Sequence, residues 1–197
     1  MISKPRRGRP RNADLDASGS TRDKLLRAAE EVVRIDGAQA LTLDAVYKRA
    51  GVSKGGLLYH FPTKEALLDG MIARYIQRSI AQEQALTKIG DADAPGASAR
   101  AAIAQLARQN PGDDTVGAAL LAAVATDLDR LAPVRAMIRQ RFEDMKGGRI
   151  GFETAAIVDL AVTGLGILEL LKLRPLALKD RKRILEALNA LVDGRSA

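Results

Sequence analysis

The chain has 197 residues, 47% of them hydrophobic, so it can bury the core of one domain or of a small domain and a larger one. It contains no cysteine and one histidine, which excludes disulfides, thiolate catalysis and a zinc finger, and we expect no metal and no cofactor. The net charge of +7 favours polyanionic partners, while abundant Ala and Leu with 3% aromatic residues favour helices over sheets.

Residues 1–19 are polar and basic and contain Gly and Pro, which predicts a flexible arm. Five cations and no acidic residue occur in its first part: Lys4, Arg6, Arg7, Arg9 and Arg11. No apolar segment follows, so we do not expect a secretion signal. Arg7 and Arg9 flank a glycine and precede Pro10, a pattern that fits a narrow, A·T-rich minor groove. The alternative is a disordered, solubilising tail.

Residues 20–62 predict three short helices, which we interpret as a DNA-binding domain. Ser20 can cap the first helix and Gly37 ends it. Thr42 can cap the second and Ser53 the third, with a glycine turn between the two. This arrangement is typical of a helix-turn-helix, whose second helix lies in the DNA major groove.

The starts of these helices supply candidate DNA contacts. Thr42 and Ser53 stand where a hydroxyl and free N–H groups can hold a phosphate, although both can be plain helix caps. Lys54 can bind guanine or a phosphate. Gly55 and Gly56 each cost about 1 kcal/mol relative to Ala inside a helix, which we attribute to close approach of this helix to the groove. The alternative is an irregular helix start.

An aromatic and basic run closes the domain. Tyr59 and His60 are adjacent, so on a helix they point about 100° apart and cannot both be core. We expect both to contact DNA, the alternative being that Tyr59 packs on Leu25 and that His60 is structural. Phe61 is expected in the core, and Lys64 is expected to bind a phosphate.

Residues 63–197 are predicted to form a helical ligand-binding and dimerisation domain. A first helix from about Thr63 to Ile89 would span roughly 40 Å at 1.5 Å per residue. Further helices are expected at about 98–109, 115–129, 133–146, 153–173 and 179–193. Gly and Pro residues separate them, and no segment shows the alternation of a strand. The predicted fold class is therefore all-α.

The last two helices differ in pattern. Apolar residues cover nearly the whole circumference of 153–173, so we expect this helix to be buried on every side. Asp159 and Glu169 interrupt its apolar stretch from Ala155 to Leu171 and argue against a membrane span. The helix at 179–193 is apolar along one stripe. Both can pack inside one body or against the same pair of a second chain in a four-helix bundle, and we favour the homodimer.

Charged residues of the body give no firm site. Four carboxylates lie near apolar helices: Asp127, Asp129, Asp159 and Glu169. One could meet a cationic ligand, but we expect surface or helix-end positions. Three arginines are candidates for an anionic effector: Arg135, Arg139 and Arg141. Arg139 is expected to pair instead with Glu143 at i,i+4. We assign no ligand-binding residue.

Several motifs at fixed spacing resemble one family, the TetR-type transcriptional regulators. They are Asp36-Gly37, Thr42-Leu43, Ala50-Gly51-Val52-Ser53, Leu58-Tyr59-His60-Phe61 and Pro62-Thr63-Lys64-Glu65-Ala66-Leu67-Leu68. The resemblance covers residues 20–70. It implies a cytoplasmic bacterial homodimer whose two heads enter successive major grooves, with Tyr59 and His60 reaching the DNA backbone. Effector binding in each body is implied to change the separation of the heads.

We therefore expect a repressor released from a palindromic operator by a small-molecule effector. The alternatives are a sequence-tolerant architectural DNA-binding protein and a regulator without an effector. An enzyme is not expected, because the single histidine lies beside Tyr59, no thiol exists and no Gly-rich phosphate loop follows a strand.

Overall fold

The structure, a computed structural model, describes residues 20–125, 127–173 and 176–195, and every regular element in these ranges is a helix. The elements are α1 (Thr21–Asp36), the 3₁₀ helix η1 (Ala38–Ala40), α2 (Leu43–Ala50), α3 (Lys54–His60), α4 (Lys64–Ile89), α5 (Ala97–Arg108), α6 (Thr115–Ala123), the 3₁₀ helix η2 (Leu128–Leu131), α7 (Ala132–Gly147), α8 (Phe152–Leu170) and α9 (Leu178–Val192). The predicted all-α class is confirmed. None of these helices is long and apolar enough to cross a membrane.

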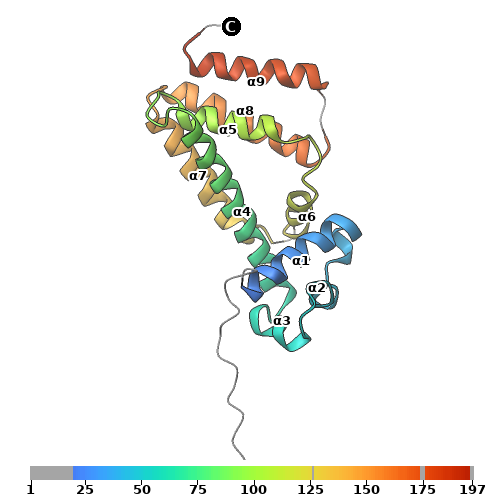
Figure 1. Ribbon diagram of the computed structural model, residues 1–197. Coiled ribbons are helices and arrows are strands. Elements are labelled where there is room, and N and C mark those ends of the chain that lie inside the picture. The colour runs from blue at the N-terminus through green and yellow to red at the C-terminus, as the bar shows by residue number, and fades with distance from the viewer. Residues whose placement is uncertain (1–19, 126, 174–175, 196–197) are drawn as a thin grey trace, which may run out of the picture.

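Helices α1, α2 and α3 form a small head at one end of the molecule, and α5 to α9 form a larger body (Figure 1). The long α4 runs from one to the other. The predicted helix-turn-helix is confirmed: Gly51 ends α2 in the left-handed conformation, with φ of 64°, and α3 begins three residues later. Glycine adopts this conformation without the steric cost that other residues incur. The arm with Arg7 and Arg9 lies outside the described residues.

The head shares its core with α4 and α6. Leu25 and Leu57 of the head are fully buried in the same apolar cluster as Leu67 of α4 and as Leu120 and Val124 at the end of α6. Phe61 is 2% exposed, as predicted. It packs so close to α4 that a Cβ on Gly70 would lie 2.7 Å from its ring. The head is therefore anchored to the body through apolar packing, and the predicted domain boundary at 62 crosses this core.

The body has a second apolar core between α5, α8 and α9. Three of its helix ranges agree with the prediction to within one residue, and α8 ends three residues before its predicted end. The range 115–129 was wrong, because α6 ends at Ala123 and the chain turns before η2. Val124, the residue after α6, is fully buried against the head. Tertiary packing at this point therefore ends the helix where no glycine or proline does.

Helix α8 is not buried on every side, which corrects the prediction. Val158 and Val162 face the body core, but an apolar stripe along α8 and the residue that follows it is exposed: Ile157, Leu160, Leu168 and Leu171. Gly164 lies in the same helical register, and a Cβ there would have nothing within 4 Å. The apolar pattern all round the helix thus reflects one face for the body core and one face left free in the single chain.

Candidate nucleic-acid interface and body cavity

The helices of the head begin at side-chain caps. The Thr42 hydroxyl accepts a hydrogen bond from the Ala45 N–H at 3.1 Å, and the Ser53 hydroxyl accepts one from the Gly56 N–H at 3.0 Å. Both capping residues are exposed, and the remaining N–H groups of the first turns stay available to an anion. The structure thus confirms that Thr42 and Ser53 are caps. Their predicted contact with phosphate remains a prediction.

The start of α3 is accessible. The Lys54 side chain is 64% exposed, and its Nζ lies 3.6 Å from the Asp44 carboxylate on α2. Gly55 has nothing within 4 Å of a notional Cβ, whereas a Cβ on Gly56 would lie 3.3 Å from the Ser53 hydroxyl. The two glycines therefore differ. Gly56 sits against the cap of its own helix, while nothing within the described chain requires Gly55 to lack a side chain.

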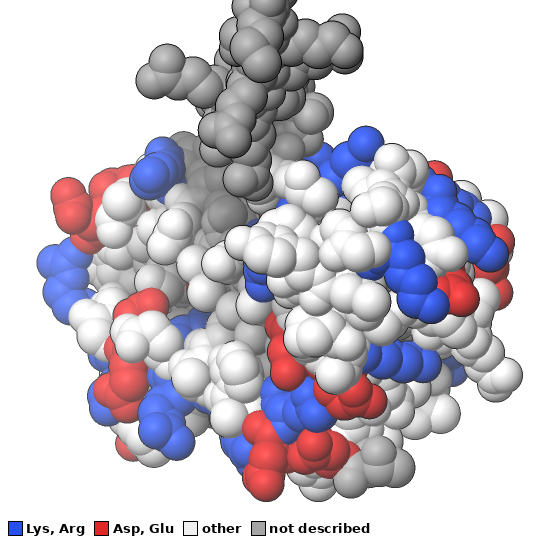
Figure 2. All heavy atoms as spheres, turned by 90° about the horizontal axis from the view of Figure 1, so that it is seen from below, with Lys and Arg blue, Asp and Glu red and all other residues white. Residues whose placement is uncertain are grey.

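Tyr59 projects from the end of α3. It is 85% exposed, so the alternative that it packs on Leu25 was wrong. His60 is half-buried beside it, the two rings meeting edge to face at 5.0 Å. Lys64 is exposed at the first position of α4. Figure 2 shows this end of the molecule, where uncharged side chains occupy the centre and Lys and Arg side chains lie around them among fewer acidic ones.

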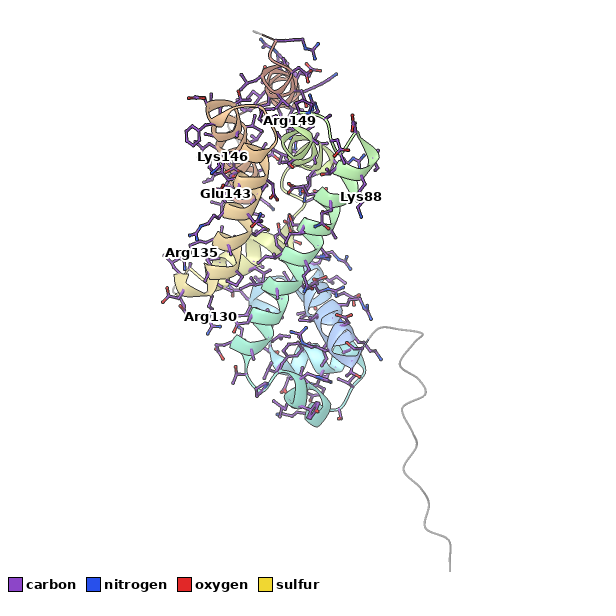
Figure 3. All side chains as sticks on the ribbon, turned by 90° about the vertical axis from the view of Figure 1, so that its left-hand side faces the viewer. Lys88, Arg130, Arg135, Glu143, Lys146 and Arg149 are labelled. Carbon is purple, nitrogen blue, oxygen red and sulfur yellow. The ribbon has the colours of Figure 1, made fainter. Side chains whose placement is uncertain are left out.

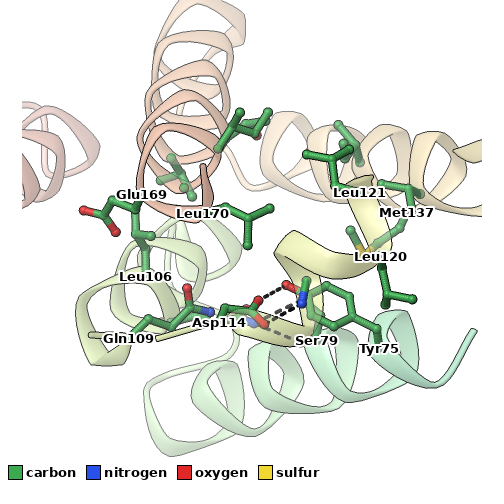
Figure 4. Close-up of a pocket in the computed structure, with 18 of the residues that line it drawn as sticks. Tyr75, Ser79, Leu106, Gln109, Asp114, Leu120, Leu121, Met137, Glu169 and Leu170 are labelled. Carbon is green, nitrogen blue, oxygen red and sulfur yellow. Dashed lines mark hydrogen bonds between the residues drawn. The ribbon is translucent and has the colours of Figure 1, made fainter. Parts of the chain in front are cut away.

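A cavity of about 410 Å³ lies between α4, α5, α6, α7 and α8 (Figure 4). Most of its wall is apolar, including Ile72, Leu106, Leu120, Val134, Met137, Val162 and Leu170. The polar lining residues include Tyr75, Ser79, Gln105, Asp114, Arg141, Thr163 and Glu169. A cavity of this size with a mostly apolar wall and a few polar groups has the character of a small-molecule site.

Asp114 and Tyr75 meet at the wall of this cavity. The Tyr75 hydroxyl donates to Asp114 Oδ2 at 2.5 Å, and Asp114 Oδ1 accepts the Gly117 N–H at 2.8 Å as the cap of α6. Burial, together with the hydrogen bond and the charge of Asp114, raises the pKa of the Tyr75 phenol. The phenol therefore stays protonated and donates. A Cβ on Gly117 would lie 2.5 Å from the carboxylate, so glycine makes room for this contact.

The other charged groups near the cavity are paired with opposite charges. The Arg181 Nε donates to Glu169 at 2.6 Å, and its Nη2 donates to the Leu106 carbonyl at 2.7 Å. Arg141 donates to Asp159 at 2.7 Å and to the Thr163 hydroxyl. Glu169 is 4% exposed and Asp159 7%, which corrects the expectation of surface charges. These pairs hold α5, α7, α8 and α9 together.

The remaining charged candidates lie at the surface. Asp127 and Asp129 are exposed, and Arg130 of η2 binds Asp127 at 3.0 Å and Asp69 of α4 at 2.6 Å. Glu143 pairs with Lys146 at 2.5 Å on the outer side of α7 (Figure 3). The predicted pairing with Arg139 was therefore wrong. No group of three or more metal-ligating side chains occurs in the described ranges.

Comparison with known proteins identifies the family. Residues 25–71 match the family described as bacterial regulatory proteins, tetR family, and residues 96–193 match the tetracyclin repressor-like C-terminal domain. The chain belongs to the TetR family. The first match contains the helix-turn-helix, and the second contains α5 to α9 and most of the cavity wall.

Individual relatives of this TetR-family chain fall into two groups. The HTH-type transcriptional regulator UidR of Escherichia coli K12 is 34% identical over 62 residues, which are 32% of this chain and only 32% of UidR. Two solved structures share the fold over nearly their whole length. The regulator SCO7518 of Streptomyces coelicolor A3(2) is 20% identical with a TM-score of 0.67, covering 87% of this chain and 98% of its own. The multidrug binding protein EbrR, complexed with ethidium, is 25% identical with a TM-score of 0.62, covering 89% and 99%.

Sequence reasoning considered Arg135, Arg141 and Glu169, which do line the cavity, but it missed Tyr75 and Asp114. Asp114 directly precedes α6, and aspartate is a preferred N-cap residue. Its capping role could therefore have been predicted from the sequence. Tyr75 packs among the apolar residues of α4, and nothing local indicates a partner 39 residues away. The Arg181 contact with the Leu106 carbonyl spans 75 residues and has no sequence signal either.

Proposed function

We propose that this TetR-family chain is a DNA-binding transcriptional repressor that a small-molecule effector releases from a palindromic operator. The exposed end of α3 is the observation that carries the proposal. Tyr59 is 85% exposed, and Gly55 is open to solvent. The exposed Tyr59 ring contributes nothing to the core of the head. Contact with an external partner therefore explains its position better than a structural role does.

The DNA contacts follow from the positions of the side chains. Lys54 and Tyr59 project from α3 toward base edges and the backbone, and Gly55 and Gly56 allow this helix to approach the groove. Phosphate contacts come from Thr42, Ser53, His60 and Lys64. The arm adds Arg7 and Arg9 in the minor groove.

The exposed stripe of α8 supports a homodimer. Four large apolar side chains stand free along it, and Gly164 between them permits a close approach of a second helix. A contiguous apolar surface on a water-exposed helix marks an interaction site. Two copies packed on α8 and α9 would bring two heads to one DNA duplex, as a palindromic operator requires.

The cavity supports control by a small molecule. EbrR, which shares the fold, has been crystallised with ethidium and with malachite green. In this chain the cavity is bounded by α6, whose end packs into the core of the head. An effector that binds the cavity better in one arrangement of α6 shifts the head by that difference in affinity. We place the protein in the cytoplasm with its operator.

Selection of bound duplexes from a random DNA pool at near-physiological salt tests the proposal. A two-fold symmetric site with half-sites about one helical turn apart is expected. Enrichment of A·T content without symmetry would favour an architectural DNA-binding protein. No enrichment would overturn DNA recognition by α3. A symmetric site from which no small molecule releases the protein would favour a regulator without an effector.

Two substitutions of lysine separate base reading from general charge. Lys54→Ala is expected to weaken binding to the selected site about tenfold, which is the contribution expected of one good side-chain contact to a base. Lys88→Ala removes the same charge at the far end of α4 (Figure 3) and is expected to leave binding within about twofold, since charges beyond a Debye length are screened. Equal effects of both would reduce the role of Lys54 to long-range attraction.

The homodimer is tested by measuring the molar mass of the protein by light scattering as it elutes from a size-exclusion column. Leu160→Glu places a charge in the stripe of α8 and is expected to give the monomer mass. Ile89→Glu, at a side chain 74% exposed near the end of α4, is the control and is expected to keep the dimer mass. A dimer that survives Leu160→Glu would move the interface elsewhere.

A further inference from the structure

The charges that line the cavity are balanced except at one residue. Glu169 is paired with Arg181, and Arg141 with Asp159. Arg135 also lines the cavity, but its side chain is 57% exposed and lies 3.9 Å from Asp129. Asp114, in contrast, forms no ion pair with a lysine or arginine of the described residues, and its carboxylate accepts hydrogen bonds from a phenol and a backbone N–H.

This carboxylate still has room for a partner. A carboxylate offers about four lone-pair positions, and Asp114 uses one for Tyr75 and one for Gly117. It is half-buried in a wall that is mostly apolar, where water solvates a charge poorly (Figure 4). A negative charge in such a place is stabilised most by a positive charge brought to it.

We propose that the cavity takes an organic cation with an apolar body, and that Asp114 is its counter-ion. The apolar side chains of α6, α7 and α8 enclose the body of the ligand, and the cavity volume of about 410 Å³ suits a drug-sized molecule. An anion would be repelled by Asp114, and the two arginines that line the cavity are already paired with Asp129 and Asp159. A neutral ligand would leave the charge of Asp114 uncompensated, so it binds more weakly than a cation of the same shape.

The position of Asp114 also connects the ligand to the head. The carboxylate that faces the cavity is the cap of α6, and the opposite end of the same helix places Leu120 and Val124 in the core of the head. A cation that draws Asp114 toward itself competes with the Gly117 N–H and with Tyr75. This coupling rests on the proposed function, whereas cation binding does not.

Three probes with one body test the ligand class: trimethyl(4-phenylbutyl)ammonium, 4-phenylbutan-1-ol and 4-phenylbutanoate. Calorimetric titration of the full chain without DNA is expected to show the ammonium binding at least tenfold more tightly than the alcohol and the carboxylate. No binding of the ammonium, or equal binding of all three, would overturn the proposal.

Asp114→Asn assigns the preference to one carboxylate. Asparagine is an equally good cap, so the start of α6 is kept while the charge is removed. The ammonium is expected to fall to the affinity of the alcohol, with circular dichroism confirming the fold. Asp113→Asn is the matched control, because Asp113 is adjacent and exposed and does not line the cavity. A cation preference that survives Asp114→Asn, or that Asp113→Asn removes equally, would overturn the assignment.

The coupling is tested on DNA. Saturating ammonium is expected to lower the affinity of the chain for its selected duplex, and to have no effect on DNA binding by Asp114→Asn. Failure of DNA selection with intact cation binding would remove the proposed function alone. A symmetric DNA site without cation binding would remove this inference alone.

Discussion

The first four helices of the chain and most helices of the body begin in different ways. Hydroxyl side chains cap α1, α2, α3 and α4, at Ser20, Thr42, Ser53 and Thr63. In the body Asp114 caps α6, but no side chain caps α5, α7, α8 or α9, which start after Gly96, Leu131, Gly151 and Ala177. A hydroxyl cap satisfies a free N–H group and fixes where a helix begins. Local capping residues thus set where the helices of the head begin, whereas most helices of the body lack such a signal.

The two cores show what replaces those signals. The buried residues of the head cluster are apolar, whereas the three buried charged residues of the described chain, Asp159, Glu169 and Arg181, all belong to the body. Their ion pairs join α7 to α8 and α8 to α9, and the bond from Arg181 to the Leu106 carbonyl joins α9 to α5, 75 residues away. Local caps set where the helices of the head begin, and polar contacts between helices set how the body helices meet around the cavity.

Breaking the buried pair of the body is expected to have the largest effect. Arg181→Met leaves Glu169 buried without a partner and is expected to lower the free energy of unfolding by about 3–5 kcal/mol, measured by urea denaturation. Adding Glu169→Leu should recover most of the loss. Arg183→Met, at a side chain 81% exposed, is the control and should change little. A loss below about 1 kcal/mol for Arg181→Met would contradict the role given to the pair.

Substitution of two glycines tests the packing of the head. Gly70→Ala forces a Cβ to 2.7 Å from Phe61 and is expected to cost about 1–3 kcal/mol of unfolding free energy. Gly55→Ala meets nothing within 4 Å and is expected to gain up to about 1 kcal/mol through helix propensity. It should nevertheless weaken DNA binding if α3 lies close to the groove. We expect the free energy of unfolding to fall for Gly70→Ala and to rise for Gly55→Ala, as measured by thermal denaturation. Changes of the same sign would refute the packing argument.

Removing a cap from the head side and adding one to the body gives effects of opposite sign. Thr63→Ala deletes the hydroxyl that accepts the Ala66 N–H at 3.1 Å and is expected to cost about 1 kcal/mol. Ala177→Ser adds a hydroxyl before α9, where the backbone is already extended, and is expected to stabilise by some tenths of a kcal/mol. Thermal denaturation of the two variants checks both signs. If Thr63→Ala did not destabilise the protein and Ala177→Ser did not stabilise it, caps would not distinguish head from body.

The pH dependence of Glu83 gives the smallest effect. Burial raises the pKa of this carboxyl, and the charges of Asp144 and Asp159 add to it against Arg141. A raised folded-state pKa means that folding favours the protonated form, so ionisation destabilises the fold as pH rises from the unfolded value through the folded one. Glu83→Gln is expected to raise the melting temperature at pH 7 and to lose this advantage near pH 4. A gain that is independent of pH would show that charge is not the cause.

The sequence predicted the head because its signals are local. Ser20, Thr42 and Ser53 each cap the helix that directly follows, and the turn needs its glycine at position 51. Phe61 was correctly placed in the core. The DNA contacts proposed for α3 and the arm are untested by the fold, although the exposure of Tyr59 agrees with them.

The sequence could not predict the body site for the opposite reason. The burial of Asp159 and Glu169 depends on arginines of other helices, and the pairing of Glu143 depended on choosing between two cations three or four residues away. The end of α6 depends on Val124 reaching the head core. Each of these outcomes requires the tertiary arrangement, which periodicity and capping residues do not contain.

The shared core of α1, α4 and α6 constrains how this protein can be recombined with others. A chimera joined at Pro62 would combine a head with foreign residues at the positions of Leu67, Met71, Leu120 and Val124, and so interrupt one apolar cluster at its centre. A head transplanted with the first half of α4 still lacks the two side chains of α6. Exchange of DNA specificity between such proteins therefore works best by replacing only the exposed side chains of α3 and the arm, with every buried residue left in place.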